Sequence, residues 1–141
     1  MEDQLLETLD LTPIDLVRIL FALMIAILFL QSGIDKIVNY QGEKSFYKEH
    51  FKDSILAGSV GLLMPVITLF EVAAGVVTAI GLVLFLVNGQ TMVACLGTLL
   101  ATLAIIQLFL GQRIAKDYAG AAVLVPYFFL TVGGVYLFAM I

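Results

Sequence analysis

The sequence predicts an all-α integral membrane protein: a four-helix transmembrane bundle with a short interfacial amphipathic helix between spans one and two. The composition supports this, because 62% of the 141 residues are hydrophobic and only 13% are charged, about half the roughly 25% of a soluble domain. A soluble domain this small cannot bury so much apolar surface. Since a membrane span takes about 20 apolar residues, the length allows roughly four spans. We therefore predict a single transmembrane domain, residues 1–141.

The first predicted span covers about residues 13–38. Thr12, Pro13 and Asp15 match an N-cap, a proline at the first helical position and an acid at the third. A signal peptide would begin with a basic leader, whereas this N-terminus is acidic, so we expect the helix to remain in the mature protein.

The longest polar connection, residues 39–57, predicts the interfacial helix. It carries an apolar and a basic stripe, each at four-residue spacing: Tyr47, Phe51 and Ile55, and Lys44, Lys48 and Lys52. This spacing fits an amphipathic helix in the headgroup layer whose lysines reach anionic lipid. The alternative is a solvated loop.

Three further apolar segments predict the remaining spans, at about residues 61–86, 91–111 and 119–140. Residues 88–90 carry a turn signal between the second and third spans. A polar connector, residues 112–118, separates the third span from the fourth.

The basic residues indicate the orientation. Arg18 is the only basic residue on the side of the two termini, and the other side carries the remaining six: Lys36, Lys44, Lys48, Lys52, Arg113 and Lys116. The positive-inside rule therefore predicts both termini on the non-cytoplasmic side of the membrane.

Each span contributes one polar side chain to the inner half of the bundle: Gln31, Glu71, Gln107 and Tyr127. Glu71 lies ~15 Å into its span at 1.5 Å per residue. An isolated carboxylate at that depth must be neutral or paired, and we expect a neutral carboxyl bonded to a neighbouring helix. These side chains either join the helices or form a ligand or proton site. An apolar slot with such groups suits the carbonyls of a quinone.

Arg18 and Lys36 share a face at opposite ends of span one, about five helical turns apart. They are either anchors that reach toward the membrane surfaces or contacts for an anion or a partner protein. Asp35, Arg113 and Asp117 belong to the same inner surface as Lys36, where an ion-pair cluster could join spans one and three.

Charge, cysteine and histidine content exclude several functions. The net charge is −4 and no basic footprint is present, so we expect no nucleic-acid partner. Cys95 is the only cysteine, which excludes chemistry by an intrachain cysteine pair. His50 is the only histidine, which excludes a bis-histidine haem within one chain. We expect no metal, no cofactor within the chain itself and no catalytic residues.

Several short motifs resemble the DoxX family, which comprises DoxX/DoxD-like four-helix inner-membrane proteins. The motifs are Arg18, Ser32–Lys36, Glu71–Gly75 and Arg113–Gly120. The resemblance extends over residues 15–138 and implies a bacterial inner (plasma) membrane and a relation to the membrane subunit of thiosulfate:quinone oxidoreductases. It also implies roles for particular positions but no reaction: Arg18, Gly33, Lys36, Glu71 and Gly75.

Three hypotheses of function follow. The first is an accessory or anchoring subunit of a quinone-linked membrane redox assembly, which binds quinone or lipid. The second is a small carrier or channel subunit in which Glu71 is a proton or cation site. The third is a purely structural subunit of a membrane complex. All three imply contacts with membrane lipids and other membrane-protein subunits, and a narrow four-helix bundle also favours a homo-oligomer.

Overall fold

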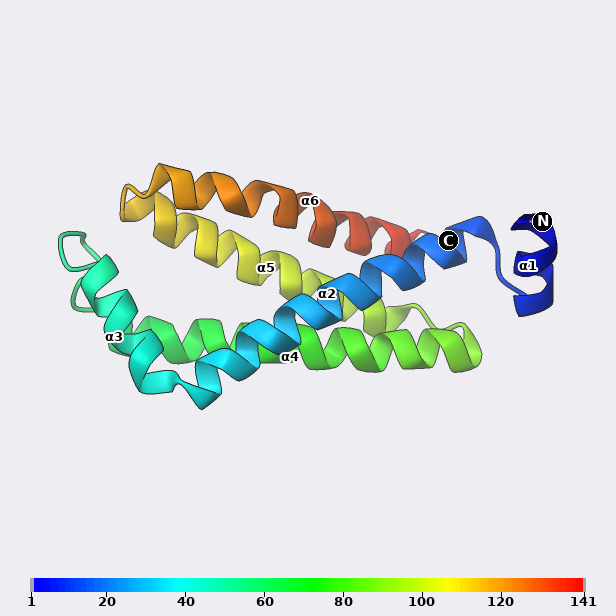
Figure 1. Ribbon diagram of the computed structural model, residues 1–141, viewed down its shortest axis with the longest axis horizontal. Coiled ribbons are helices and arrows are strands. Elements are labelled where there is room, and N and C mark those ends of the chain that lie inside the picture. The colour runs from blue at the N-terminus through cyan, green and yellow to red at the C-terminus, as the bar shows by residue number, and fades with distance from the viewer. Residues whose placement is uncertain (1, 141) are drawn as a thin grey trace.

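The computed structural model describes residues 2–140, except the side chains of Glu2, Asp3 and Leu5, and within this range the chain is helical (Figure 1). Its helices are α1 (Glu2–Leu9), α2 (Pro13–Val38), α3 (Tyr40–His50), α4 (Val60–Asn88), α5 (Met92–Ile114) and α6 (Tyr118–Ala139). Four of them, α2, α4, α5 and α6, are long and apolar enough to cross a membrane. The predicted fold class is confirmed, including the short helix between the first two spans.

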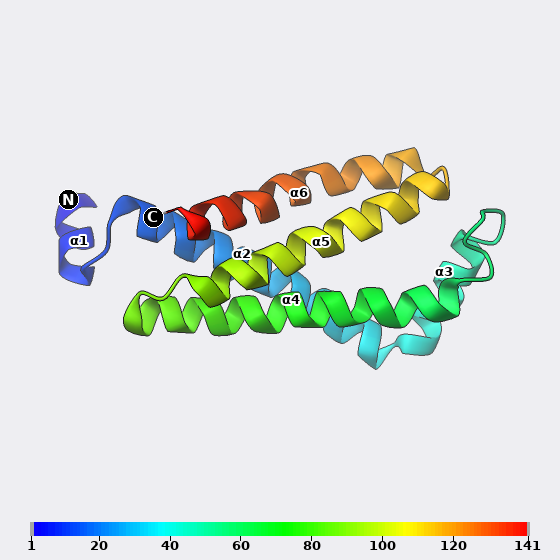
Figure 2. The same cartoon turned by 180° about the vertical axis from the view of Figure 1, so that it is seen from behind.

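The four long helices form a bundle. α4 packs between α2 and α5, α5 packs against α6, and α6 returns to α2. Both termini and the α4–α5 turn lie at one end of the bundle, here called the terminal end (Figures 1 and 2). α3 and the α5–α6 turn lie at the other end, here called the α3 end.

Most of the bundle's apolar surface faces outward. In the most apolar stretch of each long helix, only 22% to 39% of the residues are buried. In water such a surface would drive aggregation, whereas lipid tails solvate it. The protein is therefore a multi-pass integral membrane protein.

Local signals define the start of α2 and the end of α4. The Thr12 hydroxyl accepts a hydrogen bond from the Asp15 amide at 3.2 Å, and the Asp15 carboxylate accepts one from the Thr12 amide at 3.0 Å. This capping box confirms the predicted start of α2. Gly89 ends α4 with φ of 73°, a left-handed conformation that favours glycine.

Two features differ from the sequence-based expectation. The acidic N-terminal segment forms α1, which we did not predict. α5 continues to Ile114, although the predicted connector begins at residue 112. Lys116 then takes a positive φ of 61°, and the Asp117 carboxylate caps α6 by accepting from the Gly120 amide at 2.9 Å.

Small residues bring the helices close together. A Cβ on Gly75 would lie 2.7 Å from the backbone nitrogen of Leu30, so α4 and α2 touch at this point. Gly81 of α4 meets the backbone of Ala94 in α5 in the same way. Toward the α3 end, α4 and α5 diverge (Figures 1 and 2).

Candidate functional site

A cavity of about 570 Å³ lies at the α3 end, where α4 and α5 diverge. Its wall is largely apolar and includes Met64 and Ile67 of α4 and Leu108 and Ile114 of α5. The volume falls within the roughly 300–1,000 Å³ of small-molecule sites in proteins. The cavity can therefore accept a ring-sized apolar ligand.

Three polar side chains from α2 and α4 form one part of the cavity wall: Ser32, Lys36 and Glu71. The Lys36 ammonium nitrogen lies 2.8 Å from Oε2 of Glu71 and donates to the Ser32 hydroxyl at 3.1 Å. Ser32 in turn donates to Oε1 of Glu71 at 3.0 Å. The side chain of Lys36 is only 8% exposed and that of Glu71 only 1%. These contacts join α2 to α4 through a buried pair whose charges sum to zero.

This pair bears on two sequence-based interpretations. The sequence predicts a neutral Glu71; in the structure the last turn of α2 places the Lys36 ammonium 2.8 Å from its carboxyl group, and a paired carboxylate can keep its charge when buried. We also considered Lys36 as an anchor that reaches toward the membrane surface. Its side chain instead turns into the bundle.

The four predicted ligand-binding residues lie in different environments. Glu71 and Gln107 both line the cavity. Gln31 lies on the exposed face of α2, and Ser32, one residue later, takes the inward position instead. Tyr127 is half-buried and packs against the central core around Phe29. The structure therefore brings together two of the four and adds Ser32 and Lys36.

α3 and the turn after it close the α3 end of the cavity. Tyr47 and Phe51 line the cavity, and a Cβ on Gly111 of α5 would lie 3.5 Å from the Phe51 ring. Burial raises the pKa of the Tyr47 hydroxyl, although the Lys36 ammonium acts in the opposite direction. Tyr47 and Phe51, two residues of the predicted apolar stripe, thus face the protein. The third, Ile55, lies beyond the end of α3 and is 87% exposed.

His50, at the end of α3, links this cover to the α5–α6 turn. Its Nε2 lies 2.7 Å from Oε1 of Gln112 and 3.6 Å from Oδ2 of Asp117. The predicted lysine stripe extends only in part along the helix, because α3 ends at His50 and Lys52, beyond it, pairs with Glu49 at 2.6 Å.

The cavity opens toward the lipid between α4 and α5. Three of its apolar lining residues are also exposed on the outer surface of the bundle: Leu63 and Val66 of α4 and Leu110 of α5, which is 57% exposed. In a bilayer this surface meets acyl chains. An apolar tail can therefore extend from the cavity into the membrane.

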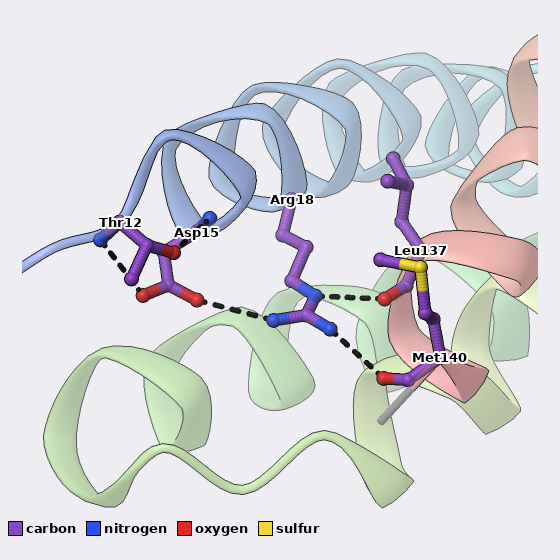
Figure 3. A network of polar contacts seen from close by, with 5 residues as sticks. All are labelled: Thr12, Asp15, Arg18, Leu137 and Met140. Atoms are coloured by element: carbon purple, nitrogen blue, oxygen red, sulfur yellow. Dashed lines mark hydrogen bonds and ion pairs between the residues drawn. The ribbon is translucent and has the colours of Figure 1, made fainter.

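Arg18 lies at the terminal end and joins α2 to the end of α6 (Figure 3). Its Nε donates to the Leu137 carbonyl at 2.7 Å, and its NH2 group donates to the Met140 carbonyl at 2.9 Å. Its NH1 group pairs with Asp15 at 3.1 Å. Carbonyls at a helix C-terminus lack partners within the helix, and the Arg18 guanidinium supplies them.

The ion-pair cluster that we considered at the α3 end does not form among the described residues. Lys36 pairs with Glu71 rather than with an aspartate. The guanidinium of Arg113 lies over the Tyr118 ring, 4.4 Å from its centroid. Asp35, on the outer face of α2, is exposed.

Fold and cavity together define a class: a four-span integral membrane protein with a lipid-facing apolar cavity that has one polar wall. Within residues 2–140, no group of three or more His, Cys, Asp or Glu side chains is placed to hold a metal ion. Comparisons with family models, with curated proteins and with solved structures found no match.

Proposed function

We propose that the protein binds a quinone in this cavity and serves as an accessory subunit of a quinone-linked membrane redox assembly. One observation carries the proposal: an apolar cavity that opens to lipid contains a polar wall with no net charge. A quinone matches these features, because it combines an uncharged ring that carries two carbonyls with an apolar tail.

The polar groups supply the hydrogen bonds that a quinone needs. The ammonium of Lys36 has three N–H donors, and one of them is engaged in the hydrogen bond to Ser32, while its contact with Glu71 is an ion pair. The amide of Gln107 offers further donors and an acceptor in the same cavity. The tail would leave between Val66 and Leu110.

The second hypothesis, a carrier with Glu71 as its cation site, is less well supported. The Lys36 ammonium already neutralises this carboxylate. A cation would have to compete with a buried ion pair for the same oxygens.

The family and location remain part of the proposal. We propose that the chain is DoxX-like, on the motifs around Arg18, Lys36 and Glu71, and that it resides in a bacterial inner membrane. We further propose that the terminal end faces away from the cytoplasm, because the α3 end carries most of the basic residues. Single cysteines at positions 5, 46 and 116, in a Cys95→Ala background, test this sidedness. Labelling of position 5 only from the cytoplasmic side would reverse the orientation.

A photoreactive azidoquinone tests binding in nanodiscs. We expect labelled peptides from the cavity-lining parts of α4 and α5, and we expect excess quinone to protect them. Ile67→Trp, which fills the cavity, should reduce the protected labelling at least tenfold. Val83→Trp places the same side chain on the exposed face of α4 and serves as the control. Labelling that excess quinone does not reduce, or that Ile67→Trp does not change, would refute quinone binding.

Copurification tests the accessory role separately. After mild detergent extraction we expect stoichiometric redox subunits with the protein. A bare homo-oligomer that moves protons or cations in liposomes would instead support the carrier hypothesis.

A further inference from the structure

We propose that Glu71 determines the charge specificity of the cavity: by pairing with Lys36 it excludes anionic amphiphiles, such as fatty acids, and admits those with uncharged headgroups. This inference rests on the proposed function, because it requires the cavity to take an amphiphile from the bilayer. It adds a rule for which amphiphiles are accepted, and it assigns that rule to one side chain.

The composition of the cavity wall leads to this inference. Lys36 is the only basic residue and Glu71 the only acidic one among the described residues that line the cavity. An apolar cavity with a free ammonium would be a strong site for a fatty acid, because charge-assisted hydrogen bonds are stronger than neutral ones. Glu71 already occupies the ammonium at 2.8 Å.

Burial makes the exclusion effective. Both side chains are almost completely removed from solvent, and charges interact more strongly there than in water. A carboxylate that approached Lys36 would lie beside the like-charged Glu71 and would also lose its own hydration. A quinone carbonyl carries no net charge and avoids this repulsion. Specificity then comes from an unfavourable contact with the wrong ligand.

Glu71→Gln should reverse the preference. Glutamine has nearly the same shape and can still accept the hydrogen bond from Ser32. It leaves the Lys36 ammonium without a counter-charge, and a bound fatty acid would restore the pair. A hydrogen bond to a charged group supports a gain in fatty-acid affinity of about tenfold or more.

A fluorescent fatty acid provides the test. Binding of cis-parinaric acid and of its uncharged methyl ester is measured in phosphatidylcholine nanodiscs for the wild type, Glu71→Gln and Glu49→Gln. The Glu49 variant is the matched control, because it also removes one carboxylate from a lysine but does so on the outside of α3. We expect a fatty-acid gain in Glu71→Gln alone and little change for the ester. Adding Lys36→Gln to the Glu71→Gln variant should abolish the gain in fatty-acid binding.

A second variant keeps the test decisive if Glu71→Gln does not fold. Gln107→Lys leaves the pair intact and makes the cavity positively charged, so it should also gain fatty-acid binding. No gain in a folded Glu71→Gln protein, or none in Gln107→Lys when Glu71→Gln does not fold, would overturn the inference.

The azidoquinone measurement separates this inference from the proposed function. Protected quinone labelling without a fatty-acid gain would refute the specificity rule and leave quinone binding intact. A wild-type protein that binds cis-parinaric acid as well as its ester would also refute the rule. Absence of protected quinone labelling, with the fatty-acid gain still present, would refute the quinone and retain the rule.

Discussion

Removing one member of the Lys36–Glu71 pair should destabilise the bundle more than removing both. At 2.8 Å and an effective dielectric constant of about 20, two unit charges attract by about 6 kcal/mol. Desolvation of each ion costs several kcal/mol and offsets much of this attraction. Lys36→Met or Glu71→Leu alone leaves an unpaired buried charge, so we expect each to lower the free energy of unfolding by about 3–5 kcal/mol.

The double variant is the informative comparison. Lys36→Met with Glu71→Leu replaces both charges by apolar side chains, and such exchanges are neutral or stabilising by about 1–4 kcal/mol in other proteins. The free energy of unfolding is measured by steric trapping in bicelles for the wild type, both single variants and the double variant. Glu49 and Lys52 form the control cycle, because solvent screens their exposed pair and leaves little coupling. If the two single effects at Lys36 and Glu71 add up in the double variant, these side chains are not coupled and our reasoning fails.

Three further predictions concern other parts of the molecule. Arg18→Lys keeps the charge but loses the forked contact to the end of α6, so it should cost about 1–3 kcal/mol and speed amide hydrogen exchange there. Gly75→Val should separate α2 from α4, because its Cβ would lie 2.7 Å from the Leu30 nitrogen. Gly61→Ala is the control, because a Cβ on Gly61 would have no neighbour within 4 Å. The melting temperature should fall for Gly75→Val only. Burial raises the pKa of Tyr47 above its ordinary value of 10.0, so the stability from its neutral hydroxyl should be present below pH 10 and be lost at higher pH. The tyrosinate absorbance that Tyr47→Phe removes should therefore appear only above pH 10, and its appearance below pH 10 would contradict the burial.

The fold class could be predicted because its signals are local. A long apolar run identifies each span regardless of what packs against it, and the capping box of Thr12 and Asp15 fixes the start of α2 within one turn. α1 was not predicted because its eight residues contain no long apolar run that would mark a helix.

The candidate site was less predictable because it depends on helix rotation. Depth alone identifies Glu71 and Gln107 as polar groups in an apolar setting. Depth does not distinguish Gln31 from Ser32, which differ by about 100° around α2 because the helix has 3.6 residues per turn. The pairing of Glu71 with Lys36 was not predicted because Lys36 lies near the end of α2. From there its side chain can reach either the membrane surface or the interior of the bundle. Only packing decides between them.

The packing of α4 against α5 changes along the bundle, and the charged pair lies at the α3 end, where the cavity is. At the terminal end, Gly81 allows the backbone of Ala94 to approach closely, and such contact leaves no room for the long stem of a lysine. Further along, α4 and α5 diverge and the cavity opens beside the Lys36–Glu71 pair, which joins α2 to α4. The space that admits the lysine stem is continuous with the space that would admit a ligand. An extra methyl group at Gly81 would therefore act far from the cavity residues, yet it should change the cavity by altering the angle between the two helices.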